Sequence, residues 1–182
     1  DIVHTLVAGA QTTGVDATRF SIGEFGGNVF AANLEFGLRI DPGQLYKLDV
    51  TSDYLGNSVE APNTREYVWV GGIISDTGYP HTWPRLNVPY YVGADASWYS
   101  RNVIISDETA VRIQPGTEFH FQPESGISVW DYSSLEVMGT AEEPVVFTSV
   151  HATPGAWDGI YVSDGQLIME HAEVHWAGDG SL

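Results

Sequence analysis

The chain has 182 residues, with 24 acidic and 7 basic side chains, a net charge of −17 and one lysine, Lys47. Nucleic acids and anionic membranes need a basic partner surface, so this composition argues against both. No apolar run approaches the roughly 20 residues of a membrane-spanning helix. Cysteine is absent, which removes disulfides and thiolate zinc sites. A hydrophobic content of 43% fits one globular domain or two small ones.

Two alternating segments lie in the first part of the chain. Apolar side chains occupy every second position from 34 to 40 and again from 46 to 50, with Asp41-Pro42-Gly43 between them. A period of two is typical of half-buried strands, and Asp, Pro and Gly favour turns. The sequence therefore predicts a β-hairpin here, and a further strand over 67–70.

After residue 80 the predicted strands become shorter and more numerous. Glycine and proline separate them, and no segment carries a helical period, which disfavours an α/β fold. The predicted strands are 102–106, 111–113, 117–121, 127–130, 135–137, 145–149, 160–162, 167–169 and 173–176.

The spacing of these strands suggests a repeat. The segment 111–113 recurs 24 residues later, 118–121 recurs 27 residues later at 145–148, and 128–130 recurs 32 residues later at 160–162. Repeats of this length indicate a solenoid, and three short strands per repeat are typical of a parallel β-helix.

Several motifs in this region match a known pattern in the expected order. They are PYYV (89–92), VRIQPGTEFHF (111–121), GTAEEPVVFTS (139–149), PGAWDGI (154–160) and EHAEVHWAG (170–178). Residues 83–178 thereby resemble the right-handed parallel β-helix repeat family of bacterial secreted and cell-surface proteins.

This resemblance implies an all-β fold in two parts. Residues 81–182 would be the first coils of a right-handed parallel β-helix, truncated at their C-terminal end. Residues 1–80 would form an N-terminal β-rich cap or a small β domain. The resemblance makes Trp157 a core residue, and the strand alternation points Arg112 outward. An open last coil would expose unpaired strand edges and apolar side chains, which predicts self-association.

The family includes adhesins, uncharacterised lipoproteins and carbohydrate-active enzymes, so the fold alone does not assign a function. The main hypothesis is a non-catalytic, extracellular or cell-surface module of a larger bacterial protein, structural or adhesive, with a polysaccharide or cell-surface glycan as partner. One alternative is the N-terminal part of a polysaccharide lyase or glycoside hydrolase. Another is an end-to-end self-assembly module. No residue pattern identifies a catalytic site.

Exposed aromatic rings are the candidate glycan-binding residues, because flat apolar faces suit stacking against sugar rings. Trp83, Trp98 and Tyr99 lie in predicted loops. Trp130, Tyr132 and Trp176 lie at predicted strand ends.

No metal-binding residues are predicted. His171, Glu173 and His175 share one face of a strand, but residues four apart are about 13 Å apart, too far for one ion. His4, His81, His120 and His151 are isolated in sequence, which favours solvated or capping roles. No EF-hand or glycine-rich nonapeptide occurs, yet the acidic loops offer the oxygen atoms that calcium prefers. Calcium is therefore the one cofactor that the sequence leaves as a candidate, without named ligands.

Overall fold

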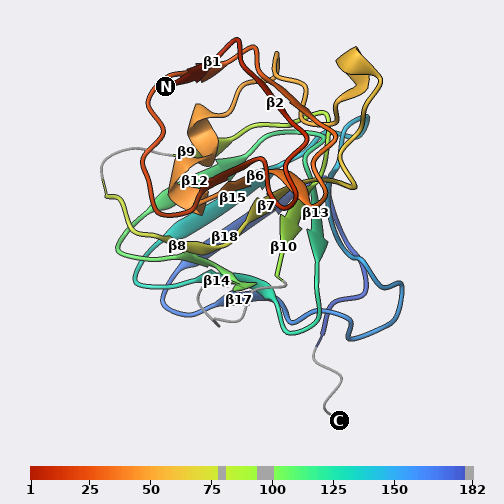
Figure 1. Cartoon of the computed structure of the whole chain (residues 1–182). Coiled ribbons are helices and arrows are strands. Elements are labelled where there is room, and N and C mark those ends of the chain that lie inside the picture. The colour runs from red at the N-terminus through yellow and green to blue at the C-terminus, as the bar shows by residue number, and fades with distance from the viewer. Residues whose placement is uncertain (78–80, 94–100, 179–182) are drawn as a thin grey trace.

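The fold is a stack of short parallel strands, described by a computed structural model over residues 1–77, 81–93 and 101–178 (Figure 1). The largest sheet has seven strands, all paired in parallel. In spatial order they are β3 (Val15–Ala17), β6 (Phe36–Ile40), β7 (Arg65–Val70), β10 (Tyr90–Val92), β13 (Glu118–Phe121), β16 (Val145–Ser149) and β19 (Ala172–Val174).

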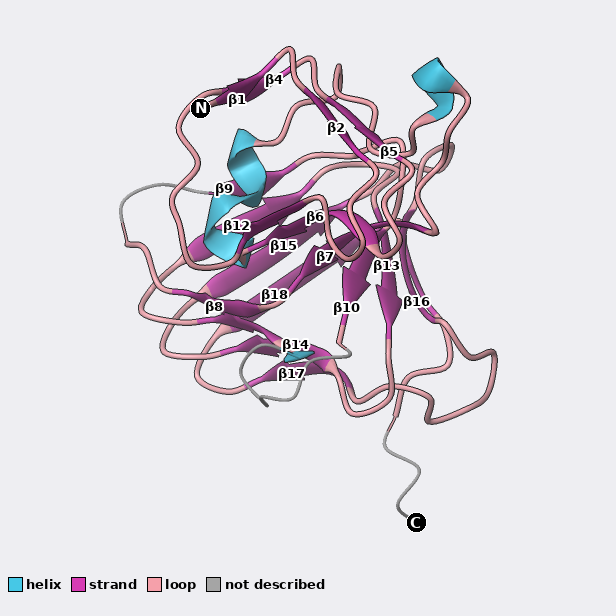
Figure 2. Cartoon of the chain, viewed as in Figure 1, coloured by secondary structure: helices cyan, strands magenta, loops and turns pink. Residues whose placement is uncertain are grey.

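Two four-stranded parallel sheets complete the coils that begin at β7, β10, β13 and β16 (Figure 2). The β14 sheet contains β8 (Gly72–Ile74), β11 (Val103–Ile105), β14 (Gly126–Val129) and β17 (Gly159–Val162). The β15 sheet contains β9 (His81–Trp83), β12 (Ala110–Ile113), β15 (Ser134–Met138) and β18 (Gln166–Glu170). From β7 onward each strand pairs with the strand three places further along the chain, which is the connectivity of a parallel β-helix.

The N-terminal segment follows the same step of three. β1 (Ile2–Val3) pairs with β4 (Phe25–Gly26), β2 (Leu6–Ala8) pairs with β5 (Val29–Ala31), and β3 pairs with β6, all in parallel. β6 then pairs with β7 across a register shift. Of the described strands before residue 80, β3, β6 and β7 thus share the seven-stranded sheet with later strands, while β1 with β4 and β2 with β5 form two separate two-stranded sheets.

The predicted hairpin around Asp41 is wrong. Residues Pro42–Lys47 form a 3₁₀ helix, η1, whose N-cap Asp41 accepts a hydrogen bond from the Gly43 amide. The preceding strand, β6, pairs in parallel with β3 and β7 instead. Alternation predicted β6 correctly, but it is the same for parallel and antiparallel partners and therefore did not reveal the pairing. A second 3₁₀ helix, η2, spans Asn57–Val59.

The strands predicted after residue 80 are confirmed, as is the 24-residue repeat that pairs Val111 with Leu135. The other two spacings are one residue too short. Phe119 pairs with Phe147, and Ile127 pairs with Ile160. The observed registers keep apolar side chains on the inner face, whereas a one-residue shift would turn them outward.

Aromatic side chains from successive coils stack inside the helix. The ring centroid of Phe119 lies 5.1 Å from Tyr90 and 5.4 Å from Phe147, on the same rung of three neighbouring coils. Trp157 is buried as predicted, with its ring 4.0 Å from Phe121. This column of rings is the centre of the core.

Buried asparagines hold the N-terminal coils together. The Asn63 amide donates to the carbonyl oxygens of Phe30 and Tyr54, while its oxygen accepts from the backbone and side-chain nitrogens of Asn33. Asn33 in turn accepts from the backbone N–H of Ala10. These bonds satisfy turn groups that the core would otherwise leave without partners.

In the described part of the chain, no helix is long and apolar enough to cross a membrane.

Candidate functional site

The predicted glycan-binding aromatics do not form one platform. Trp83 is fully buried, with its ring 6.1 Å from that of Phe119. The prediction that Trp83 binds glycan is therefore wrong. The neighbouring prolines indicated a loop, but Trp83 is a core residue of β9. Trp98 and Tyr99 lie outside the described residues.

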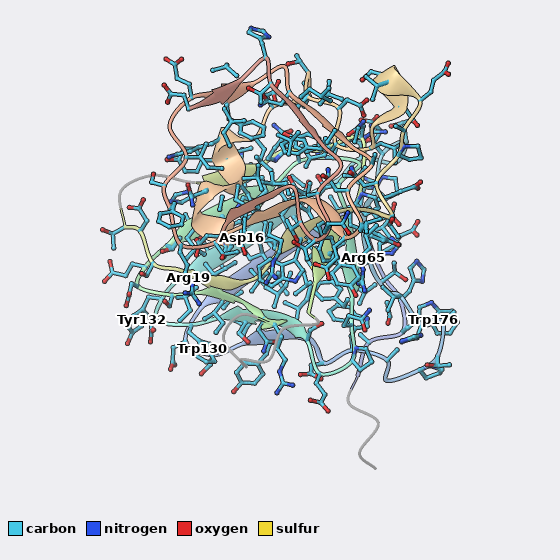
Figure 3. All side chains as sticks on the ribbon, viewed as in Figure 1. Asp16, Arg19, Arg65, Trp130, Tyr132 and Trp176 are labelled. Atoms are coloured by element: carbon cyan, nitrogen blue, oxygen red, sulfur yellow. The ribbon has the colours of Figure 1, made fainter. Side chains whose placement is uncertain are left out.

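The remaining three predicted aromatics lie on different parts of the surface. Trp130 and Tyr132 follow β14, whereas Trp176 lies on the opposite side of the molecule in Figure 3. Tyr132 is 82% exposed on a turn, and Trp176 is 40% exposed beyond β19. Of these, Trp130 lines a hollow.

That hollow, which we call the β14 hollow, has a volume of about 420 Å³ on the outer face of the β14 sheet. Trp130 and Tyr161 contribute aromatic surface to it, and Tyr161 is 61% exposed. The residues lining the hollow are Asn102, Gly126, Ile127, Ser128, Trp130, Asp158, Gly159 and Tyr161. It therefore combines aromatic rings with carboxylate, amide and hydroxyl groups.

Small residues create the depth of the hollow. Ser128 pairs with Tyr161 and Gly126 pairs with Gly159, so two glycines and a serine form its floor. A Cβ atom on Gly126 would lie only 2.6 Å from the carbonyl oxygen of Gly159. Gly159 has φ +96°, a conformation that side chains rarely adopt. The glycines are therefore required both for the close stacking of the coils and for the concave surface.

The outer face of the seven-stranded sheet carries a second cluster. Phe36, Trp69 and Tyr91 form a small apolar cluster there, separate from the core. Two arginines cover it: the Arg39 guanidinium lies 4.2 Å from the Trp69 ring centre, and that of Arg65 lies 5.3 Å from Phe36. Arg65 also donates a hydrogen bond to the Tyr91 hydroxyl. We call this surface the arginine face.

Beside it lies a group of titratable side chains. His120 Nε2 is 2.5 Å from the Glu118 carboxylate, and His120 Nδ1 is 3.5 Å from the Tyr67 hydroxyl. Burial, followed by the negative charge of Glu118, raises the pKa of Tyr67 above its usual value. Tyr67 is therefore protonated at neutral pH and can donate a hydrogen bond, but it cannot act as a base.

Other charged residues are distributed without forming a metal centre. His175 Nε2 lies 3.0 Å from Glu173. Arg112 points outward as predicted and binds Glu136 through two N–H groups. Across residues 1–77, 81–93 and 101–178, no three His, Asp or Glu side chains are close enough to hold one ion.

Sequence reasoning missed Tyr161 and the arginine face for different reasons. Tyr161 alternates with the apolar residues Ile160 and Val162, a signal for outward orientation that was available from the strand itself. Arg39 and Arg65 lie in different coils, on β6 and β7. The pairing of these strands includes a register shift, so their spacing in the sequence does not show that the two arginines share a surface. Only the stacking of coils brings them together.

A comparison with protein-family models, with curated proteins and with solved structures finds no match to this chain. The class of protein therefore rests on the strand ladders, which define a parallel β-helix.

Proposed function

We propose that the chain is a non-catalytic, right-handed β-helix module of a larger bacterial surface protein, and that it binds glycan in the β14 hollow. The observation that carries this proposal is the pairing of aromatic and polar groups around one concave site. Tyr161 offers an exposed ring for stacking on a sugar, and Trp130 adds aromatic surface. Asp158 and Ser128 can hydrogen-bond to sugar hydroxyls.

Parallel β-helices suit this role because their sheets present wide, rigid outer faces. The ring of Tyr161 stands on a strand that is paired with β14, so its position is set by the ladder and not by a loop. A site held in this way loses little conformational entropy when a ligand binds. Extracellular location agrees with glycan as the partner and is part of the same proposal.

Replacing Tyr161 with alanine tests the site. Loss of the exposed ring should weaken binding to the best neutral polysaccharide of a screened panel by about tenfold, equivalent to ~1.4 kcal/mol. Affinity electrophoresis or calorimetry would measure this change. Tyr132→Ala is the matched control, because Tyr132 is an exposed tyrosine, at 82% against 61% for Tyr161, that does not line the hollow.

Equal weakening by both variants would place the ligand elsewhere. Failure of the unmodified chain to bind any polysaccharide would reject the glycan-binding proposal. New unsaturated or reducing ends in the polysaccharide would instead favour the enzyme alternative. The group formed by Tyr67, His120 and Glu118 would then be the first to mutate, because it is equipped for proton transfer.

A second candidate function is end-to-end self-association, favoured by the state of the last described coil. Val162, Met169 and Val174 are 36%, 36% and 46% exposed. They occupy the same rungs as Val129, Val137 and Phe147, which are fully buried one coil earlier. The outer edges of β17, β18 and β19 have no partner strand within the described residues. A second copy stacked on this surface would cover the side chains and pair the edges.

We therefore expect the apparent mass of the 182-residue chain to rise with concentration in light scattering coupled to gel filtration. Val174→Asp should abolish the rise, because it places a charge on the apolar surface of the last coil. Val59→Asp is the control: Val59 is also 46% exposed but lies in η2. A constant monomer mass for the unmodified chain at all concentrations would reject end-to-end self-association.

A further inference from the structure

An exposed phenylalanine lies where two further hollows meet. Phe20 follows β3 and is 75% exposed. One hollow, of about 430 Å³, lies between residues 18–21, the start of η1 and β8. The other, of about 410 Å³, extends from the same residues toward β6. Because Thr18, Arg19 and Phe20 line both hollows, we call residues 18–21 the Phe20 ridge; Figure 3 labels Arg19 on it.

Side chains of η1 hold the Phe20 ridge in place. Gln44 Nε2 donates to the carbonyl oxygen of Phe20 at 2.7 Å, and Gln44 Oε1 accepts from the backbone N–H of Ile22 at 2.5 Å. Lys47 Nζ donates to the Ser21 hydroxyl at 3.1 Å. The backbone on both sides of the exposed ring is therefore fixed, and little conformational entropy is lost when a ligand contacts it.

The charges that line the two hollows are already offset within the protein. The described lining holds two arginines and three aspartates, namely Arg19, Arg39, Asp16, Asp41 and Asp76. Burial raises the pKa of Asp16, but hydrogen bonds from Thr18 and the arginine charges outweigh burial and lower it, so Asp16 is ionised opposite Arg39 in the ladder of β3 and β6. Asp76 lies 3.5 Å from His81 Nε2. Attraction to an ion of either sign therefore does not select the occupant.

The small apolar area of the ridge favours a saccharide over a protein partner. Among the described residues that line the two hollows, Phe20 and Ile73 are the exposed large hydrophobic side chains, at 75% and 41%. A stable protein interface buries roughly 800 Å² per partner around an apolar centre, which one ring and one isoleucine do not provide. One flat ring does suffice to stack on one sugar unit.

Polar groups around the ring fit the hydroxyls of a neutral sugar. Arg19 and Ser75 are exposed and offer N–H and hydroxyl groups, while Asp41 offers carboxylate oxygens on the opposite side of one hollow. A sugar hydroxyl both donates and accepts hydrogen bonds, so it can satisfy a carboxylate and a guanidinium at the same site. A neutral, hydroxyl-rich ligand is therefore the occupant that these mixed groups match.

We infer that the Phe20 ridge is a second glycan-binding site, which takes a neutral saccharide by stacking on Phe20 and by hydrogen bonds from the two flanking hollows. It shares no lining residue with the β14 hollow, so it goes beyond the proposed function and does not depend on it. Two separate sites on one rigid module would let it hold two segments of a polysaccharide at once, which raises the overall affinity for the polymer.

Four neutral oligosaccharides test this inference: cellohexaose, laminarihexaose, maltohexaose and mannohexaose. Saturation-transfer NMR on the full 182-residue chain would identify which of them bind, and calorimetry would give the affinity. Phe20→Ala should weaken the binding of at least one by about tenfold, because the stacking surface is lost. Tyr132→Ala should bind as the unmodified chain does, since Tyr132 is an exposed ring that lines neither flanking hollow. Far-UV circular dichroism and thermal melting would confirm that each variant is folded.

Two further variants separate stacking from apolar contact. Phe20→Leu keeps an apolar side chain without a flat face and should lose binding as Phe20→Ala does. Phe20→Trp keeps a flat face and should retain binding. Binding by Phe20→Leu at the affinity of the unmodified chain would overturn the inference.

The Tyr161→Ala variant separates this inference from the proposed function. An oligosaccharide whose binding falls in Phe20→Ala but not in Tyr161→Ala would support the ridge site whether or not the β14 hollow binds glycan. No binding of any of the four, or loss in Tyr161→Ala alone, would overturn the ridge site, and the second result would leave the proposed function standing. A self-association that Phe20→Ala abolishes, without oligosaccharide binding, would overturn it in favour of a second copy of the chain.

Discussion

Phe119→Ala is expected to lower the free energy of unfolding by about 4 kcal/mol, because replacing a buried phenylalanine removes its contacts and leaves a cavity. Phe119 is fully buried, and its ring lies between Tyr90 of the preceding coil and Phe147 of the following coil. The residue therefore links three coils, and neighbouring strands fixed by their ladders cannot collapse into the gap.

Urea unfolding followed by tryptophan fluorescence would measure this loss. Phe20→Ala is the matched control, because Phe20 is 75% exposed and should change stability by less than about 0.5 kcal/mol. Similar effects of the two substitutions would show that the stacked rings are not the centre of the core.

Asn63→Ala is expected to destabilise the chain by about 3 kcal/mol, although it removes little apolar contact. The substitution takes away four hydrogen bonds at a residue that is 3% exposed. Two buried carbonyl oxygens and two nitrogens of Asn33 would lose a partner, and each unsatisfied buried group costs about 1–3 kcal/mol. The N-terminal coils should loosen first, because Asn63 connects them to one another.

Hydrogen exchange would locate that loosening, with faster exchange expected in β2, β5 and β6 than in β13 and β14. Asn57→Ala provides the comparison, since Asn57 is an exposed residue of η2. If Asn63→Ala and Asn57→Ala unfolded at the same urea concentration, the buried amide network would have no measurable role in stability.

Short-range patterns were sufficient for the strands of the later coils. Alternating apolar residues separated by glycine and proline predicted β12, β15 and their neighbours, since inward and outward side chains must alternate along a strand. The same rule failed at Asp41, where an alternating segment was assigned to a hairpin although a 3₁₀ helix follows β6. A strand pattern specifies which face is buried but not the direction of the partner strand.

The candidate site was less accessible to sequence reasoning. Trp130 was predicted and does line the β14 hollow, but Trp83 is a core residue and Tyr161 was missed. The sequence around an aromatic residue does not show whether its ring is buried or exposed, because that depends on how the coils stack. The arginine face was even harder to predict from the sequence, because Arg39 and Arg65 become neighbours only through the pairing of β6 with β7.

By itself, the sequence determined the all-β class, the acidic surface and the three-strand repeat of the later coils, because these depend on composition and local periodicity. The tertiary structure decided which strands pair, where the coils leave a hollow and which cations lie over which rings. Those features depend on register, and register is set by the packing of side chains in one coil against those of the next.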